Sequence, residues 1–184
     1  MKLILCFQGI TEVEIVAGHI CRLLCDAIVS PANSFGFMDG RLDRLLSERF
    51  GWDLEKRVQE AIQSRPVGEL LVGEAIVVPT HDDKTPWLIC APTMRVPMRI
   101  CTSVNAYLAM KAILAAVMSY AGVTPIETIA VPGLGTGVGQ LAPELSAGQM
   151  AQAYRDGPAG AQIPGQLRGG SAHASPSESD GNDL

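Results

Sequence analysis

Short apolar segments alternate with segments of helical periodicity along most of this chain, and this alternation restricts the fold more than any other feature. Six segments have the apolar, partly β-branched composition of strands, namely 3–7, 13–18, 26–31, 74–79, 87–92 and 128–133. A chain that alternates strands with helices forms a sheet covered by helices on both faces. We therefore expect an α/β domain.

The segments between these strands predict four helices, which cover residues 42–50, 54–62, 103–120 and 142–154. Asp53 can cap the second helix, and Thr102 or Ser103 can cap the third. Gly122 suits the C-terminal end of the third helix. That helix is apolar nearly all round, so we expect it to be deeply buried.

Length and composition indicate one domain followed by a tail. The chain has 184 residues, of which 47% are hydrophobic, and this suits a single domain with a sizeable core at 1–154. Residues 155–184 are rich in glycine, serine, proline and alanine and contain no aromatic residue. Such a segment buries too little surface to offset its ordering entropy, which predicts a disordered tail.

The charge and the cysteines restrict the partners and the compartment. A net charge of −5 argues against binding nucleic acid through phosphate charge alone, but backbone N–H groups can bind a nucleotide without lysine. The five cysteines are odd in number and lie mostly in apolar segments, as expected of reduced core residues in an intracellular protein. Because no segment is long enough to span a membrane, we expect a cytoplasmic protein without a membrane partner.

Two loops after predicted buried strands are rich in groups that can hold a ligand. The first, SPANSFGFMDGRLD at 30–43, carries an asparagine, two carboxylates and two glycines. The second, VPGLGTGVGQLAP at 131–143, has four glycines spaced two residues apart, which lets successive N–H groups point at an anion. It lacks the ending of a Walker A loop and the register of a Rossmann turn. Ligands of open α/β sheets bind beyond the carboxyl ends of strands, where both loops lie.

Taken together, these loops resemble those of the macrodomain family. The resemblance rests on VAGHICRLLCDAIVSPANSFGFMDGRLDRLL and IAVPGLGTGVGQLAP, which occur in the family's order and at about its spacing. APTMRVP and VNAYLAM are similar to one bacterial branch. The resemblance covers the chain to about Tyr154. It implies a three-layer α/β/α fold, a mixed sheet of about six strands and a cleft for ADP-ribose.

In the first loop the resemblance assigns two side chains to the distal ribose. Asn33 matches the family's ribose-contacting asparagine, although it also suits a turn. Asp43 matches the acidic residue that helps activate water in hydrolases of the family, and it also suits the N-terminus of a helix. Both are therefore candidate catalytic residues. Gly40 matches a glycine of the family's catalytic loop, whereas Arg41 stands where hydrolases usually have glycine, which favours binding over catalysis.

The second loop matches the family's phosphate loop. The resemblance implies that the N–H groups of Gly135, Thr136, Gly137 and Val138 hold the diphosphate. Gly139 replaces an aromatic residue that often stacks near the distal ribose, so we expect a more open cleft at that end.

The adenine end of the predicted cleft departs from the family. Gly18-His19-Ile20 replaces the usual Gly-Asp-Ile, and a neutral imidazole at His19 can accept the hydrogen bond from the adenine amino group. Ile20 keeps a backbone role. Binding should then weaken as the pH falls through roughly 6 to 7, where histidine gains a proton. The alternative, a surface or capping histidine, has almost equal weight.

The sequence therefore predicts a protein that binds ADP-ribose, free or linked to protein or nucleic acid, and that removes mono-ADP-ribose without a metal or other cofactor. One alternative is an ADP-ribose-1″-phosphate phosphatase using the same cleft. Another is a catalytically inactive macrodomain that serves as an interaction module. A metal site at His19, Cys21 and Cys25 is much less favoured, because no fourth ligand lies nearby in sequence.

Overall fold

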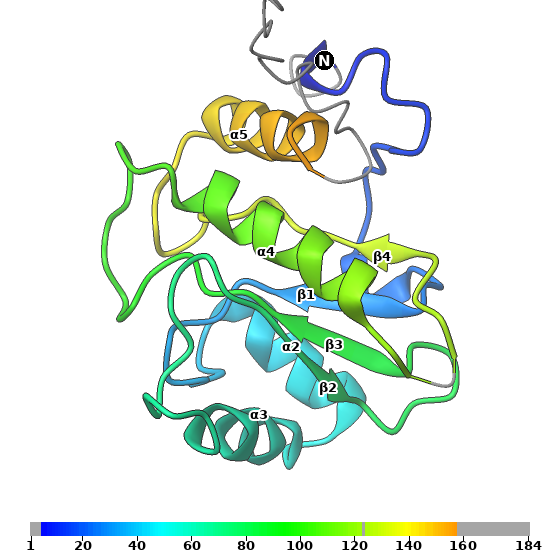
Figure 1. Ribbon diagram of the computed structural model, residues 1–184, viewed down its shortest axis with the longest axis vertical. Helices are drawn as coiled ribbons and strands as arrows, with labels where there is room; N and C mark the ends of the chain where they lie inside the picture. Colours follow the sequence, from blue (N-terminus) through cyan, green and yellow to red (C-terminus); the bar gives the residue numbers. More distant parts are fainter. Residues whose placement is uncertain (1–4, 123, 158–184) are drawn as a thin grey trace, which may run out of the picture.

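A computed structural model describes residues 5–122 and 124–157 and contains a four-stranded mixed sheet (Figure 1). The strands are β1 (Ala27–Ser30), β2 (Ile76–Pro79), β3 (Trp87–Cys90) and β4 (Ile129–Ala130), in the spatial order β2-β3-β1-β4. β1 is parallel to both β3 and β4, whereas β2 is antiparallel to β3. The predicted α/β class and the mixed character of the sheet are confirmed.

Helices cover both faces of the sheet, which makes three layers (Figure 1). α4 (Asn105–Ser119) and α5 (Pro143–Arg155) lie on one face, and α2 (Arg41–Phe50) and α3 (Leu54–Gln63) lie on the other. Side chains of β1 alternate between the two cores: Ala27 and Val29 pack toward α4, and Ile28 packs toward α2 and α3. The central strand is therefore completely buried.

The prediction of about six strands is wrong for the described residues, which form four. In the segment expected at 3–7, Leu5 and Cys6 are helical, and residues 1–4 lie outside the described part. The segment expected at 13–18 has no regular structure, and its side chains are largely exposed. A strand-like composition forms a strand only where a neighbour pairs with it. Neither segment has such a partner among the described residues.

The four expected helices are present, but their capping differs from the prediction. Asp53 occupies the N-cap position of α3, yet its carboxylate makes an ion pair with Arg57 instead of capping the helix. α4 begins one residue later than the Ser103 cap requires, although the Ser103 hydroxyl still accepts a hydrogen bond from the N–H of Asn105 at 3.3 Å. α4 ends at Ser119, before the expected stop at Gly122.

Burial of α4 is one-sided rather than complete. Ala106, Ala109 and Ile113 have no exposed surface, whereas Met118 is 59% exposed. The expected deep burial of the whole helix is therefore wrong. α4 packs against the sheet and α5, and its remaining side faces solvent. No helix in 5–122 or 124–157 has both the length and the apolar composition needed to cross a bilayer. Most of the predicted tail, 158–184, lies outside the described residues.

Candidate functional site

A cleft of about 350 Å³ lies where the chain leaves β1, β3 and β4, at the carboxyl ends of these three parallel strands. The two loops singled out in the sequence form its walls, and Met94 and Pro97 close one side. Eight predicted site residues line it: Asn33, Gly40, Asp43, Gly135, Thr136, Gly137, Val138 and Gly139. Residues far apart in the chain thus meet in one place, as the topology requires.

Asp43 combines burial with a single side-chain hydrogen bond. It lies in the first turn of α2 with 8% of its surface exposed, and its Oδ1 accepts a hydrogen bond from the Ser30 hydroxyl at 2.5 Å. Burial raises the pKa of the Asp43 carboxyl, the Ser30 hydrogen bond acts in the opposite direction, and the charges of Asp39 and Glu55 raise it further. A carboxyl group with a raised pKa suits proton transfer near neutral pH.

Gly40 makes room for the Asp43 carboxyl. It occupies the N-cap position of α2, and a Cβ atom placed on it would lie 2.8 Å from Asp43 Oδ2. Such a contact is shorter than van der Waals packing allows, so any side chain at this position would displace the carboxyl group. The predicted glycine is thus explained by the position of the aspartate rather than by backbone conformation.

Asn33 shapes the loop that carries it. Its Oδ1 accepts hydrogen bonds from the N–H groups of Phe35 at 3.0 Å and Phe37 at 3.4 Å, and its Nδ2 donates to the Phe37 carbonyl at 3.0 Å. The alternative interpretation, a turn-forming asparagine, therefore describes the ligand-free loop. One amide hydrogen of Asn33 remains for a ligand, and the residue lines the cleft, so both roles are compatible.

The second loop presents unpaired N–H groups. Inside it, Gln140 N–H donates to the Gly137 carbonyl at 3.1 Å and Leu141 N–H to the Gly135 carbonyl at 3.0 Å, while Gly135 has a φ of +73°. Within the described part of the chain, no group accepts a hydrogen bond from the N–H groups of residues 137, 138 or 139. Three successive free donors along a cleft wall form an anion-binding surface.

Gly139 is packed more tightly than the sequence indicated. A Cβ atom there would lie 2.6 Å from both the Gly135 carbonyl oxygen and Ile100 Cγ1, and Ile100 N–H donates to the Gly139 carbonyl at 2.8 Å. Glycine is therefore required because Ile100 and the loop backbone cover its Cα. The role of Ile100 was not predicted, because the residue lies between the expected strand at 87–92 and the expected helix at 103–120, in a segment without a recognisable pattern. The Thr136 hydroxyl donates to the Gly133 carbonyl at 2.8 Å, so it also serves the loop.

The predicted adenine end is not part of the lining of this cleft. His19 is exposed and Ile20 is half-buried, both at the start of the short 3₁₀ helix η1 (Ile20–Arg22), and neither lines the cleft. His19 stands at the N-cap position of η1 without a side-chain cap hydrogen bond, which fits a surface histidine better than a capping one. A contact between His19 and adenine stays a prediction.

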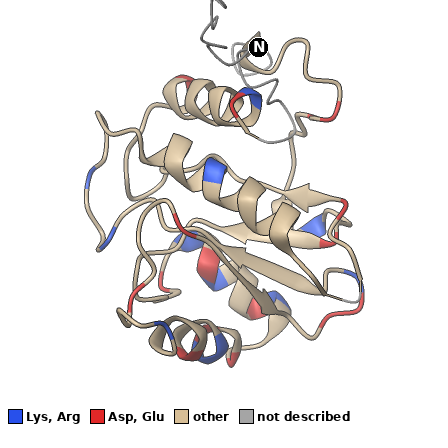
Figure 2. Cartoon of the chain, viewed as in Figure 1, with Lys and Arg blue, Asp and Glu red and all other residues tan. Residues whose placement is uncertain are grey.

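Arginines near the cleft differ in whether they already make an ion pair. In Figure 2 the loop between β3 and α4 carries blue but no red, and its two arginines are Arg95 and Arg99. Arg95 makes an ion pair with Glu69 at 2.8 Å and lies over the Phe35 ring, so it is occupied elsewhere. Arg41 is exposed, lines the cleft and has no ion-pair partner among residues 5–122 and 124–157.

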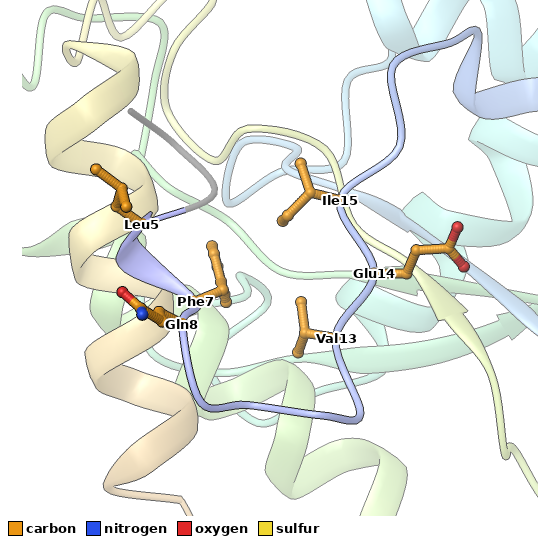
Figure 3. A pocket seen from close by; sticks show the side chains of 6 residues that line it. All are labelled: Leu5, Phe7, Gln8, Val13, Glu14 and Ile15. Carbon is orange, nitrogen blue, oxygen red and sulfur yellow. The ribbon is translucent and has the colours of Figure 1, made fainter. Parts of the chain in front are cut away.

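A second hollow, of about 520 Å³, lies beside the N-terminal segment (Figure 3). Its lining residues are Leu5, Phe7, Gln8, Val13, Glu14 and Ile15. Figure 3 shows the Glu14 carboxylate directed away from the other five side chains. Among the described residues only Gln8 and Glu14 bring polar side chains to this hollow, so the smaller cleft is the candidate site. The described residues also hold no cluster of three histidine, cysteine, aspartate or glutamate side chains suited to a metal ion.

Known proteins match most of this chain. A family model, the Macro domain, matches residues 29–150. An uncharacterized protein from Aquifex aeolicus (strain VF5) is 31% identical over 144 residues, which cover 78% of this chain and 81% of that protein.

Solved structures share the fold. The macrodomain of Mycobacterium tuberculosis DarG matches with a TM-score of 0.62 and 22% identity, over 77% of this chain and 88% of that chain. A mutant of the Oceanobacillus iheyensis macrodomain, solved with ADPR, matches with a TM-score of 0.64 and 22% identity, over 76% of this chain and 74% of that chain.

Proposed function

This chain belongs to the Macro domain family, and from that premise we propose that its cleft binds ADP-ribose, either free or attached to a protein or a nucleic acid. The observation that carries the proposal is the row of three unpaired N–H groups at residues 137–139. A diphosphate supplies several acceptor oxygens, and it needs no lysine when backbone donors surround it. The net charge of −5 is therefore no obstacle.

The opposite wall supplies groups for a ribose. The remaining amide hydrogen of Asn33 can donate to a ribose hydroxyl, and Asp43 can accept from one. A ligand that joins a diphosphate to a ribose would contact both walls at once. An isolated phosphate or an isolated sugar would use one wall only. ADP-ribose has both parts in the required order.

We further propose that the protein releases mono-ADP-ribose from its carrier. Water adds at the anomeric carbon of the distal ribose, the bond from that carbon to the acceptor oxygen breaks, and the acceptor takes the proton. Asp43 is the candidate base that orients the water, and its raised pKa brings it nearer to the working pH. The loop N–H groups hold the diphosphate and fix the position of the sugar.

Arg41 supports a second candidate, hydrolysis of ADP-ribose-1″-phosphate. Arg41 lines the cleft two residues before Asp43, and its guanidinium has no ion-pair partner in the described part of the chain. A phosphate on the distal ribose would give this arginine a partner of opposite charge. Arginine at this position also departs from the glycine usual in hydrolases of the family, so an inactive module that only binds is the third outcome.

Calorimetric titration with ADP-ribose, ADP and AMP tests binding. We expect affinity to fall in that order, because ADP lacks the distal ribose and AMP also lacks the second phosphate. Absence of binding at millimolar ADP-ribose would refute the proposal. Release from a mono-ADP-ribosylated protein, compared between wild type and Asp43→Ala, then separates an enzyme from a module. ADP-ribose-1″-phosphate, assayed in parallel with phosphate detection, decides the second candidate.

A further inference from the structure

We propose that Ser30 is a positioning residue: its hydroxyl holds one oxygen of the Asp43 carboxyl group, so that the other oxygen, Oδ2, meets the ligand or the attacking water. The inference rests on the proposed function for its ligand but not for its geometry. Ser30 ends a strand that the sequence marks only as buried and apolar, and no sequence pattern separates it from its neighbours.

Ser30 acts through Asp43 because it does not reach the cleft itself. It has no exposed surface and is absent from the cleft lining. Its backbone is fixed against β3, since it lies opposite Cys90 and its carbonyl accepts the N–H of Ala91 at 3.1 Å. A rigid strand therefore aims the hydroxyl, and the hydroxyl orients the carboxyl group.

The two carboxyl oxygens of Asp43 have different surroundings. Oδ1 accepts the Ser30 hydroxyl at 2.5 Å, a short distance typical of a charge-assisted O–H···O bond. Oδ2 lies 2.8 Å from the place a Cβ would occupy on Gly40, which lines the cleft. Among the described residues no side chain donates to Oδ2. The arrangement leaves Oδ2 as the oxygen with unused hydrogen-bonding capacity beside the cleft.

The charges around Asp43 make this single donor important. Asp39 in the preceding loop and Glu55 on α3 both act on Asp43 with like charge, and the buried Cys90 thiol of β3 is also close enough for electrostatic interaction. Burial and these carboxylates disfavour the ionised form. The Ser30 hydrogen bond is the interaction that favours it. Ser30 therefore sets how readily Asp43 ionises as well as which oxygen it presents.

Carboxyl-carbon NMR of the ligand-free protein tests the geometry directly. Ser30→Ala should raise the pKa of Asp43, whereas Ser30→Thr, which keeps the hydroxyl, should restore it, and Ser30→Cys, a weaker donor, should fall between them. Ser34→Ala is the matched control, because Ser34 is equally buried in the same loop but its hydroxyl has no partner among the described residues. Unchanged titration of Asp43 in Ser30→Ala would overturn the proposal.

Release assays across pH test the functional consequence. The acidic limb of the rate profile should move to higher pH in Ser30→Ala, with kcat reduced and KM changed less, and Ser30→Thr should reverse both effects. A purely structural serine would lower the melting temperature without moving the limb, which would also contradict the inference. Failure of the wild type to bind ADP-ribose would refute the proposed function alone, because the NMR titration needs no ligand.

Discussion

The two ends of β1 hold two aspartates in opposite states. Asp26 directly precedes the strand, and its Oδ2 accepts hydrogen bonds from Glu127 N–H at 2.9 Å, Thr128 N–H at 2.7 Å and the Thr128 hydroxyl at 2.8 Å. Asp43 accepts a hydrogen bond from Ser30, the last residue of the strand, and this is its one donor within residues 5–122 and 124–157. Burial acts against both carboxylates, yet the pKa of Asp26 is lowered by its donors and the pKa of Asp43 is raised.

The difference separates a structural carboxylate from one with capacity for a ligand. At Asp26 three donors from residues 127 and 128 stabilise the charge and join β1 to the start of β4, which gives this carboxylate a structural role. At Asp43 the fold buries a carboxyl group without enough donors, which costs stability and leaves an oxygen for an incoming group. Substitutions of Asp26 should therefore change mainly the stability, and substitutions of Asp43 should change mainly the release rate.

The largest expected effect is on catalysis at Asp43. Asp43→Asn should lower the rate of mono-ADP-ribose release by about 10²–10⁴-fold, the usual contribution of a general base. The same variant should melt at a higher temperature than wild type at pH 7. The folded pKa of Asp43 is raised, so its ionised form destabilises the fold above the unfolded pKa of about 3.9, and asparagine removes that cost. If Asp43→Asn were less stable than wild type and fully active, Asp43 would be the structural carboxylate and not the catalytic one.

Asp26→Ala should show the converse pattern. Loss of the carboxylate leaves two N–H groups and a hydroxyl without their acceptor, and we expect a loss of about 1–2 kcal/mol in the free energy of unfolding. Affinity for ADP-ribose should be unchanged in the folded protein. Because the pKa of Asp26 is lowered, its contribution is present above the unfolded pKa and disappears as pH falls through the folded pKa, below about 4.

Urea unfolding at pH 7 and at pH 3 measures this contribution. The difference between wild type and Asp26→Ala should shrink at the lower pH. An equal difference at both pH values would show that Asp26 acts through packing and not through its charge.

Gly40→Ala should disturb the Asp43 end without removing a polar group. The new Cβ would meet Asp43 Oδ2 at 2.8 Å and displace it, so we expect the release rate to fall about tenfold and stability to fall by about 1 kcal/mol. Gly148→Ala is the control, because a Cβ on that α5 residue meets nothing within 4 Å. Equal kinetics for wild type and Gly40→Ala would mean that Asp43 does not need its present position.

The sequence predicted the α/β class and most of the residues that line the cleft, but it did not predict the number of strands. Asn33, Asp43 and the glycines at 135–139 line one cleft, as expected of loops that follow parallel strands. Such loops can be located in a sequence from local patterns alone. The described residues of the segments 3–7 and 13–18 form no strand, because pairing depends on neighbours that a local pattern does not reveal. Ser30 and Ile100 were missed for a similar reason, since each matters through one contact between distant segments.

The smallest expected effect concerns His19, which lies at neither end of β1. If its imidazole accepts a hydrogen bond from adenine, protonation removes one neutral hydrogen bond, worth about 0.5–1.5 kcal/mol. Calorimetry at pH 8 and pH 6 should then show affinity falling by about 2–12-fold in wild type. His19→Ala should lose this difference, whereas Asp43→Asn should keep it, so the two variants assign the pH dependence to one residue. Equal affinity at both pH values, with His19→Asp also unchanged, would remove His19 from the site and confine recognition to the cleft.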